Sequence, residues 1–177
     1  LCAAPGGKST LLAGLLTPGS LLVANEVIKP RAGVLADNLT RWGTLNAFVT
    51  NNDPRDFGRL PGFFDVLVVD APCSGSGLFR KEPGAVAEWS LEAVTLCAQR
   101  QQRILGDAWK ALREGGLLVY STCSYSKAEN EDQLDWLAGA FAVESVRVPL
   151  KPEFGGIVET ASDRAGAFGY RFYPDRV

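Results

Sequence analysis

Short apolar runs alternate with amphipathic stretches along the chain, which is the pattern of an α/β fold built around a parallel sheet. We predict strands where residues such as Val, Leu and Phe cluster, at 21–24, 47–50, 63–69 and 117–121. The run at 63–69 is almost entirely apolar, as is typical of a strand buried on both faces of its sheet. A further strand is predicted at 143–148.

Two helices are predicted from capping signals and helical spacing. Pro30 suits the first turn of a helix that continues to Trp42 and ends at Gly43. Ser90 is suited to cap a long helix, whose apolar residues recur at helical spacing until glycines 115–116 stop it.

The later part of the chain gives weaker signals. Ser126 and Glu129 have the spacing of a capping box, which predicts a helix that continues to about Phe141. The glycines at 155–156 and 166–169 then predict loops, and no closing strand is expected.

Length and composition indicate one domain over residues 1–177, because 46% hydrophobic residues can build a core. The net charge of −2 shows no basic excess, so any nucleic acid would be held by local clusters or by other segments. No apolar run approaches the roughly 20 residues that span a bilayer, and no signal peptide opens the chain. Because methionine is absent and Leu1–Cys2 looks like the tail of a first strand, we expect a fragment truncated at both ends.

The cysteine and histidine content narrows the chemistry. The four cysteines (Cys2, Cys73, Cys97 and Cys123) are widely spaced, which argues against a structural metal site or a disulfide framework. This usage fits the reducing cytoplasm, and we expect no metal. Histidine is absent, so acid–base and triad chemistry based on histidine are excluded within this chain. Cys97 lies on the apolar face of a predicted helix and is interpreted as a core residue.

Chemically distinctive residues follow each of the predicted strands. In open α/β sheets, ligands bind beyond the carboxyl ends of the strands, so these groups are expected along one rim. They are Ala3–Lys8, Asn25–Glu26, Asn52–Asp53, Asp70–Cys73 and Thr122–Cys123.

The first three groups predict a nucleoside site. Gly6 and Gly7 let the backbone approach a ligand, and the amides of the following helix attract a carboxylate or a phosphate. Glu26 could accept hydrogen bonds from ribose hydroxyls, and Asp53 from an adenine amino group. Each also has a plain structural explanation. The glycines could simply form a strand–helix turn, Glu26 could be a solvated surface residue, and Asp53 could serve a turn. Together, without a diphosphate clamp, they favour S-adenosylmethionine over a dinucleotide.

The last two groups predict nucleophilic chemistry on a planar base. Small residues after Asp70 form a loop that a base could enter, and Asp70 could hydrogen-bond the ring nitrogen and amino group of cytosine. Adjacent strands lie about 5 Å apart, so Cys73 and Cys123 are expected to face one pocket. A nearby lysine would lower the thiol pKa. The plain alternative for Cys73 is a small buried hydrophobe.

These motifs resemble the Sun/nucleolar-protein family of RNA (cytosine-5) methyltransferases. The resemblance runs from Leu1 to about Glu131 and rests on segments that occur in the family's order: Cys2–Lys8, Asp70–Gly77, Tyr120–Tyr125 and Glu129–Glu131. Three shorter segments are most similar to the bacterial 16S ribosomal RNA branch: Thr40–Gly43, Leu78–Lys81 and Arg171–Pro174.

The resemblance implies a Rossmann-like class I fold that depends on S-adenosylmethionine, with helices on both faces of a mostly parallel, twisted sheet. It implies that the methionine end of the cofactor is held by Cys2, Ala3, Ala4, Pro5, Gly6, Gly7 and Lys8. It assigns the ribose to Glu26 and the adenine to Asp53. Cys123 would be the nucleophile, Cys73 would assist enzyme release, and Asp70 would orient the cytosine beside the cofactor.

The implied substrate is RNA, most simply ribosomal RNA with transfer RNA as the alternative, and the implied protein is a cytoplasmic monomer. Two rival functions remain open. In a DNA cytosine methyltransferase, Cys73 would attack the base and Cys123 would be structural. A non-catalytic module would bind the cofactor or assist ribosome assembly without transferring a methyl group.

Overall fold

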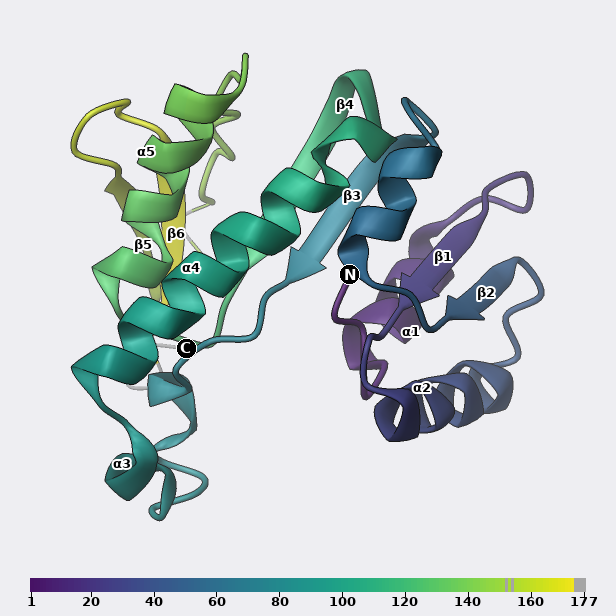
Figure 1. The fold of residues 1–177 in the computed structure, drawn as a ribbon, viewed down its shortest axis with the longest axis horizontal. Helices are drawn as coiled ribbons and strands as arrows, with labels where there is room; N and C mark the ends of the chain where they lie inside the picture. The colour runs from purple at the N-terminus through teal and green to yellow at the C-terminus, as the bar shows by residue number, and fades with distance from the viewer. Residues whose placement is uncertain (152, 154, 174–177) are drawn as a thin grey trace. The chain divides into compact units, whose positions relative to one another are not determined.

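A computed structural model describes residues 1–151, 153 and 155–173, which divide into two compact units. Unit 1 comprises residues 1–72 and 103–121, and unit 2 comprises residues 73–102 and the described residues from 122 onward. The chain therefore changes unit directly before Cys73 and directly before Thr122. Helix α4 (Leu91–Ala108) contributes residues to both units (Figure 1).

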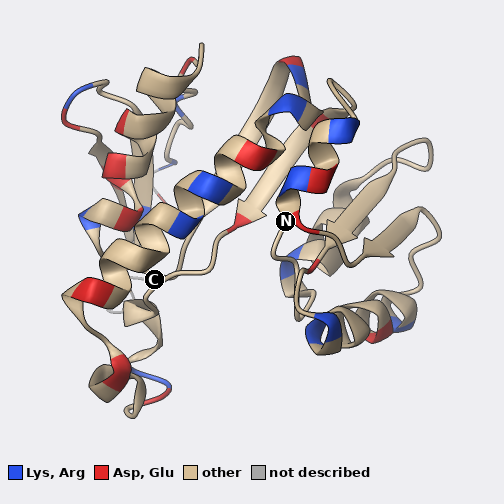
Figure 2. Ribbon diagram, viewed as in Figure 1, with Lys and Arg blue, Asp and Glu red and all other residues tan. Residues whose placement is uncertain are grey.

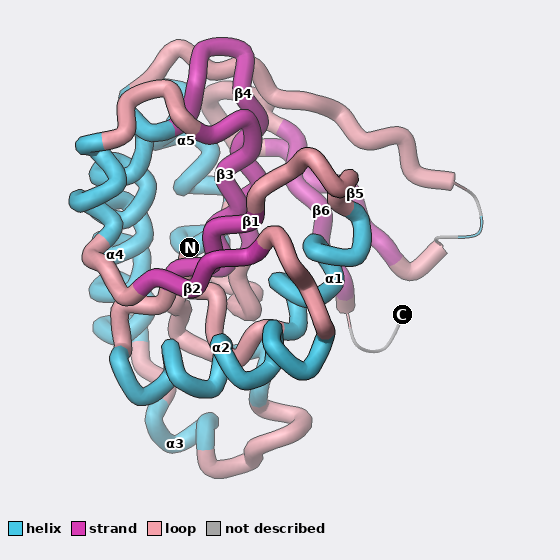
Figure 3. The backbone as a smooth tube through the Cα atoms, turned by 90° about the vertical axis from the view of Figure 1, so that its right-hand side faces the viewer, coloured by secondary structure: helices cyan, strands magenta, loops and turns pink. Residues whose placement is uncertain are grey.

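Unit 1 alternates helices with parallel strands, as the sequence predicts. Its further elements are α1 (Gly7–Leu15), β1 (Leu22–Asn25), α2 (Lys29–Trp42), β2 (Ala47–Thr50), the 3₁₀ helix η1 (Pro54–Arg59), β3 (Phe64–Asp70), the 3₁₀ helix η3 (Trp109–Ala111) and β4 (Leu112–Ser121). Strands β1 and β2 pair in parallel, and so do β3 and β4 (Figure 3).

The first residues of the chain lie between these two strand pairs. The Ala3 amide donates to the carbonyl of Asn25 in β1 at 2.9 Å. Leu1 bonds to β3 on its other side, donating to the Val68 carbonyl and accepting from the Asp70 amide. Residues 1–3 thus stand where the expected strand tail would be, and the order across unit 1 is β2, β1, residues 1–3, β3, β4. This is the strand order of a Rossmann-like sheet.

Local signals fix helix α2. Pro30 occupies its first turn, and Gly43 ends it with φ 80°, a left-handed conformation that favours glycine. The helix packs against β2 and α1 (Figure 1). Its buried Leu35 and Leu39 join Ala4 and Ala24 in an apolar cluster. The glycine loop and the strand ends therefore share one packed core.

The predicted end of the long helix is wrong. Ser90 caps α4 as expected, accepting a hydrogen bond from the Ala93 amide at 3.0 Å, but the helix ends at Ala108. Strand β4 already begins at Leu112, which pairs with Phe64 of β3 ahead of a register shift. The glycines at 115–116 lie inside this strand at that irregularity, because pairing with β3 outweighs the helical spacing of the preceding apolar residues.

Unit 2 is less regular than unit 1. Besides its part of α4, it contains the 3₁₀ helix η2 (Ser76–Leu78), the short helix α3 (Ala85–Glu88), the 3₁₀ helix η4 (Lys127–Glu129), α5 (Glu131–Ala140) and the antiparallel strands β5 (Ile157–Ala161) and β6 (Phe168–Phe172). Within the described residues, no helix of either unit is long and apolar enough to cross a membrane.

Three predictions fail in unit 2. Residues 143–148 form no strand but bond to the β5–β6 hairpin through single contacts. The Val148 amide donates to the Tyr170 hydroxyl at 2.6 Å, and the Ser145 hydroxyl accepts from the Phe168 amide at 2.8 Å. That hairpin was not predicted, and Gly169, expected in a loop, lies inside β6. The capping box is also wrong: Ser126 makes no side-chain cap and α5 begins at Glu131, because Glu129 is buried among other donors.

Candidate active site

The glycine loop forms a tight turn between residues 1–3 and helix α1. Gly6 adopts φ 116°, and a Cβ built there would lie 3.1 Å from a methyl carbon of Leu35, so only glycine fits. A Cβ on Gly7 would meet no atom within 4 Å, which leaves the start of α1 open on that side. The first turn of α1 carries no acidic residue. Its amides are therefore available to an anionic group.

Glu26 organises this loop from inside. Its side chain is only 2% exposed, so the surface glutamate considered from the sequence is excluded. One carboxylate oxygen accepts from the Ala4 amide at 3.3 Å and the other from the Ile28 amide at 3.0 Å. Arg31 completes the arrangement by donating to the Ala4 carbonyl at 2.8 Å. The predicted contact of Glu26 with a ribose stays a prediction.

Asp53 follows β2 and caps η1. Its Oδ1 accepts from the Arg55 amide at 3.1 Å, and the Asp53 amide donates to the side chain of Asp56 at 3.2 Å. Its second oxygen lies 3.6 Å from Arg103 of α4. The turn role considered from the sequence is thus present. Since the side chain is 27% exposed, a contact with a base remains compatible with this role and stays a prediction.

Asp70 ends β3, and two side chains hold its carboxylate. Lys8 Nζ lies 2.8 Å from Oδ2, and the hydroxyl of Ser121 donates to Oδ1 at 3.0 Å. The structure therefore joins Lys8, predicted from the glycine loop, to Asp70, predicted from the base loop. Reasoning from the sequence missed Ser121 and Arg31, although the pairing of β3 with β4 places Ser121 opposite Asp70.

The two predicted catalytic thiols lie together in unit 2. Their sulfur atoms are 2.8 Å apart, although the residues are 50 positions apart in the chain. Cys123 is exposed and Cys73 is half-buried, so a base could reach Cys123 more directly. The amide of Gly77 donates to the Cys123 carbonyl at 2.7 Å, which ties the two loops side by side.

The contact between the two sulfurs also affects the pKa of Cys73. Hydrogen bonding with Cys123, followed by burial, raises the pKa of the Cys73 thiol well above its ordinary value. The lowering of the thiol pKa that the sequence predicted from a nearby lysine is therefore wrong for Cys73, and either sulfur can donate in the contact between them. Burial also raises the pKa of Cys2 in unit 1 and of the half-buried Cys97 in α4, which opposes nucleophilic roles for both.

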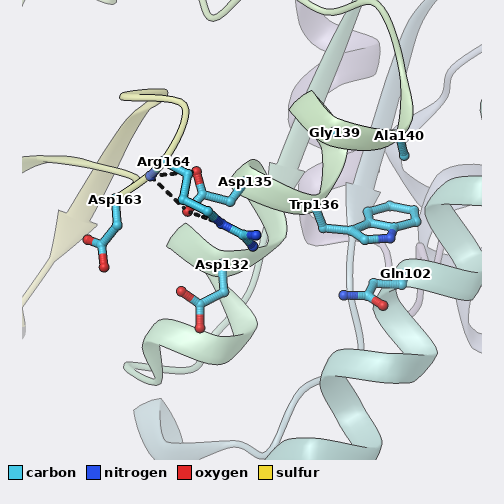
Figure 4. A pocket seen from close by; sticks show the side chains of 8 residues that line it. All are labelled: Gln102, Asp132, Asp135, Trp136, Gly139, Ala140, Asp163 and Arg164. Carbon is cyan, nitrogen blue, oxygen red and sulfur yellow. Dashed lines mark hydrogen bonds and ion pairs between the residues drawn. The ribbon is translucent and has the colours of Figure 1, made fainter.

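A hollow in unit 2 has none of these residues in its lining. It has a volume of about 640 Å³ and is lined chiefly by α5 and by the turn before β6 (Figure 4). Asp135 there accepts from the backbone amides of Arg164 and Ala165, so its carboxylate already serves the turn. None of the predicted site residues lines this hollow, and we assign it no role.

A smaller cavity in unit 1 has a volume of about 110 Å³, and Ala3, Lys8 and Asp70 belong to its otherwise mostly apolar lining. Ligand pockets usually measure at least roughly 300 Å³, so this cavity alone is too small for a nucleoside. Both signs of charge occur along α4, where two arginines lie between an acidic residue in the first turn and another near the end (Figure 2).

The strand order of unit 1, with a glycine turn and an acidic residue after β1, defines a Rossmann-like methyltransferase fold of class I. The chain belongs to the family described as 16S rRNA methyltransferase RsmB/F, which it matches over residues 1–174. Of the terminal motif that suggested this branch, Pro174 lies outside the described residues.

Individual relatives agree with this assignment. Ribosomal RNA small subunit methyltransferase F of Pectobacterium carotovorum is 42% identical over 142 residues, which is 80% of this chain and 29% of that protein. The chain thus spans about three tenths of this curated relative.

Two solved structures are each 30% identical to the chain. The crystal structure of PH0851 has a TM-score of 0.79 over 95% of this chain and 39% of that one. NSun6 from Pyrococcus horikoshii with SFG has a TM-score of 0.71 over 90% of this chain and 37% of that one.

Proposed function

We propose that the protein transfers a methyl group from S-adenosylmethionine to carbon 5 of a cytosine in RNA, with 16S ribosomal RNA as the substrate. The observation that carries this proposal is the pair of sulfurs 2.8 Å apart, of which the Cys123 sulfur is exposed. The named relatives act on ribosomal RNA of the small subunit, which supports the choice of substrate. Such a substrate places the enzyme in the cytoplasm, where we propose that it acts as a monomer without a metal.

The residues of unit 1 fit the cofactor. The open start of α1 beside Gly7 suits the carboxylate of S-adenosylmethionine, because helix amides favour an anion and no acidic side chain competes in the first turn. Glu26 and Asp53 would serve the ribose and the adenine. When bound, the cofactor supplies an electrophilic methyl group. The chain's own residues have to make the cytosine reactive.

Cys123 performs that activation in our proposal. Carbon 5 of cytosine belongs to an aromatic ring and is a weak nucleophile. Addition of the Cys123 thiolate to carbon 6 forms a carbon–sulfur bond and turns carbon 5 into an enamine-like centre that accepts the methyl group. In this proposal the Cys73 thiol is the donor in the 2.8 Å contact and stabilises the Cys123 thiolate before the attack. Asp70, held by Lys8 and Ser121, orients the ring nitrogen and amino group.

The same contact explains how Cys73 could finish the reaction. Once Cys123 is bonded to carbon 6, its sulfur carries no negative charge and no longer holds the Cys73 proton. The pKa of Cys73 then falls, Cys73 releases its proton to water, and its thiolate can remove the proton from carbon 5. The electron pair of that carbon–hydrogen bond reforms the ring double bond and expels the Cys123 thiolate. The base has to leave any stack for these steps, which favours an unpaired or locally opened nucleotide.

Two measurements test the proposal. Mapping of methylated cytosines in RNA from cells with and without the gene should show at least one 16S site that depends on the gene. With the purified full-length protein, Cys123→Ala should abolish methyl transfer. Cys73→Ala should accumulate a covalent protein–RNA complex, because carbon 5 is methylated but its proton is not removed.

The opposite outcome would favour the rival mechanism. If Cys73→Ala abolished the attack and Cys123→Ala left turnover intact, Cys73 would be the nucleophile, as in DNA cytosine methyltransferases. If the full-length wild-type protein transferred no labelled methyl group to any cellular RNA, the non-catalytic module would be the better description.

A further inference from the structure

A buried carboxylate in unit 2 connects the loops that carry the two thiols. Glu129, at the end of η4, is 0% exposed. Its carboxylate accepts hydrogen bonds from the residue that directly follows each cysteine: from the Ser74 amide at 2.9 Å and hydroxyl at 2.5 Å, and from the Ser124 hydroxyl at 2.6 Å. One side chain thus holds both loops.

From these contacts we propose that Glu129 is a positioning residue that sets the separation of the Cys73 and Cys123 sulfurs. Its role in catalysis rests on the proposed methyl transfer, but its effect on the thiol pair does not. Glu129 acts through Ser74 and Ser124, which adjoin the two cysteines, and is not itself a catalytic residue.

The Glu129 carboxylate is also held by a residue outside the two cysteine loops. Gln101 of α4, also fully buried, donates to Glu129 Oε1 at 3.0 Å. The four donors approach a carboxylate that lies out of water, where hydrogen bonds to a charged acceptor are strong and their loss is costly. The position of the carboxylate is therefore well defined, and the two cysteine loops take their positions from it.

Other contacts shape these loops and also join them. Asn130 donates to the carbonyls of Ser124 and Ser126 at 2.9 and 2.7 Å, which shapes the Cys123 loop alone. The Tyr125 amide donates to the Ser76 hydroxyl at 2.8 Å, and the Gly77 amide donates to the Cys123 carbonyl.

The hydroxyls of Ser74 and Ser124 lie 3.3 Å apart, and both donate to the same oxygen of Glu129. Glu129 is thus the common acceptor for the residues that follow the two cysteines. Without it, we expect these two residues to move apart and the sulfurs to separate.

The test measures the thiol pair directly, without RNA. Oxidised glutathione reacts first at the exposed Cys123, and the Cys73 thiol then displaces glutathione to close a Cys73–Cys123 disulfide. Two protein thiols are oxidised and one glutathione disulfide is reduced to two thiols. The closure rate depends on the separation of the sulfurs, and mass spectrometry of the linked peptides reports it.

We expect Glu129→Gln to slow closure about tenfold and to lower kcat at least about tenfold, because an amide nitrogen in place of Oε2 cannot accept the bond from the Ser124 hydroxyl. The KM for S-adenosylmethionine should stay within about twofold, since the cofactor residues belong to unit 1. Asp135→Asn is the matched control. It also converts a buried carboxylate of unit 2 that accepts backbone amides, but it serves the turn at Arg164 and should leave closure and kcat within about twofold.

The positioning role of Glu129 and the proposed methyl transfer can be contradicted independently of each other. If Glu129→Gln closed the disulfide as fast as the wild type, the positioning role would be excluded. Should that variant fail to fold, Ser124→Ala removes one donor from the same link and should slow closure about threefold or more. An unchanged rate there would also contradict the role. A wild-type protein that closed its disulfide rapidly but methylated no RNA would instead overturn the proposed function.

Discussion

The two units bury different kinds of side chain. In unit 1 most buried residues are apolar, with Ser9, Asn25 and Glu26 as the polar exceptions, and the cluster around Leu35 lies next to the glycine loop. In unit 2 the buried set is mostly polar and comprises Gln101, Ser124, Glu129, Glu131, Gln133, Asp135 and Ser162. Burying a polar group is costly unless it is hydrogen-bonded. We therefore infer that unit 1 is stabilised mainly by apolar packing. Unit 2 depends more on hydrogen bonds and ion pairs of its buried polar side chains, some of which lie next to the thiols.

The largest effect is expected where the cysteine loops touch. A Cβ on Gly77 would lie 2.2 Å from the Cys123 carbonyl oxygen, a backbone atom that cannot move without moving the thiol. Gly77→Ala should therefore lower methyl transfer by about 100-fold or more, because displacements near 1 Å at reacting groups have effects of this size. Steady-state kinetics with RNA measure it.

Gly84→Ala is the matched control in the same unit. A Cβ there meets no atom within 4 Å, and Gly84 already has right-handed helical angles of φ −62° and ψ −26°. Its activity should equal that of the wild type. If both variants were equally active, the two cysteine loops would tolerate separation, and unit 2 would not depend on the contacts around its thiols.

The next largest effect is expected from loss of a buried ion pair in unit 2. Arg171 donates to both carboxylate oxygens of Glu131, with Nε 2.8 Å from Oε1, and to the Tyr125 carbonyl at 2.9 Å. Arg171→Ala should lower the free energy of unfolding by about 3–5 kcal/mol, because it leaves a buried carboxylate unpaired. Arg147→Ala is the control. It breaks a bidentate pair with Glu159 whose arginine is 64% exposed, and should lose no more than about 1 kcal/mol in denaturant unfolding.

The pH dependence of this pair has a defined sign. Burial alone would raise the pKa of Glu131, but hydrogen bonds from Arg171 bring it below the ordinary 4.5. A carboxyl whose pKa is lowered in the folded state stabilises the protein above its unfolded pKa, and this stabilisation is lost as the pH falls through the folded value. The stability difference between wild type and Arg171→Ala should be full near neutrality and shrink below pH 4.5. A difference that grew in acid would contradict the assignment.

In unit 1, we expect the loss of buried side-chain volume to lower stability most. Leu35 is fully buried beside Gly6, and Leu35→Ala should lower the free energy of unfolding by about 2–5 kcal/mol through transfer and cavity terms. Val34→Ala on the same helix removes a side chain that is 48% exposed and should stay within about 0.5 kcal/mol. Denaturant unfolding measures both. Equal losses in the two variants would show that the apolar cluster does not carry the stability of unit 1.

The same contrast explains what the sequence could predict. In unit 1, β1, α2 and β2 were predicted to within one residue, since Pro30, Gly43 and the apolar runs act over short distances. The proximity of the two thiols was also predictable, because the geometry of a parallel sheet brings the ends of neighbouring strands together. Both kinds of prediction depend only on residues close together in the sequence or on the regular geometry of a parallel sheet.

Unit 2 was predicted less well because its contacts join distant residues. Glu129 has the right spacing for a capping box with Ser126, but Ser74 and Gln101 supply its donors from far earlier in the chain. The hairpin of β5 and β6 mixes polar and apolar residues that are mostly half-buried, so no alternation marks it. Buried polar networks have no period along a sequence, and the structure was needed to find this one.

The smallest effect is expected at an exposed ion pair of unit 1. Arg113 of β4 lies 2.9 Å from Asp65 of β3, within 0.1 Å of the Nε contact in the buried Glu131–Arg171 pair at 2.8 Å, yet the two side chains are 56% and 75% exposed. Water and salt screen such a pair, so Arg113→Ala should cost no more than about 1 kcal/mol. A double-mutant cycle with Asp65→Asn measures the coupling, which should vanish in high salt. A loss as large as that of Arg171→Ala would mean that directional contacts carry unit 1 as well, and the contrast between the units would then fail.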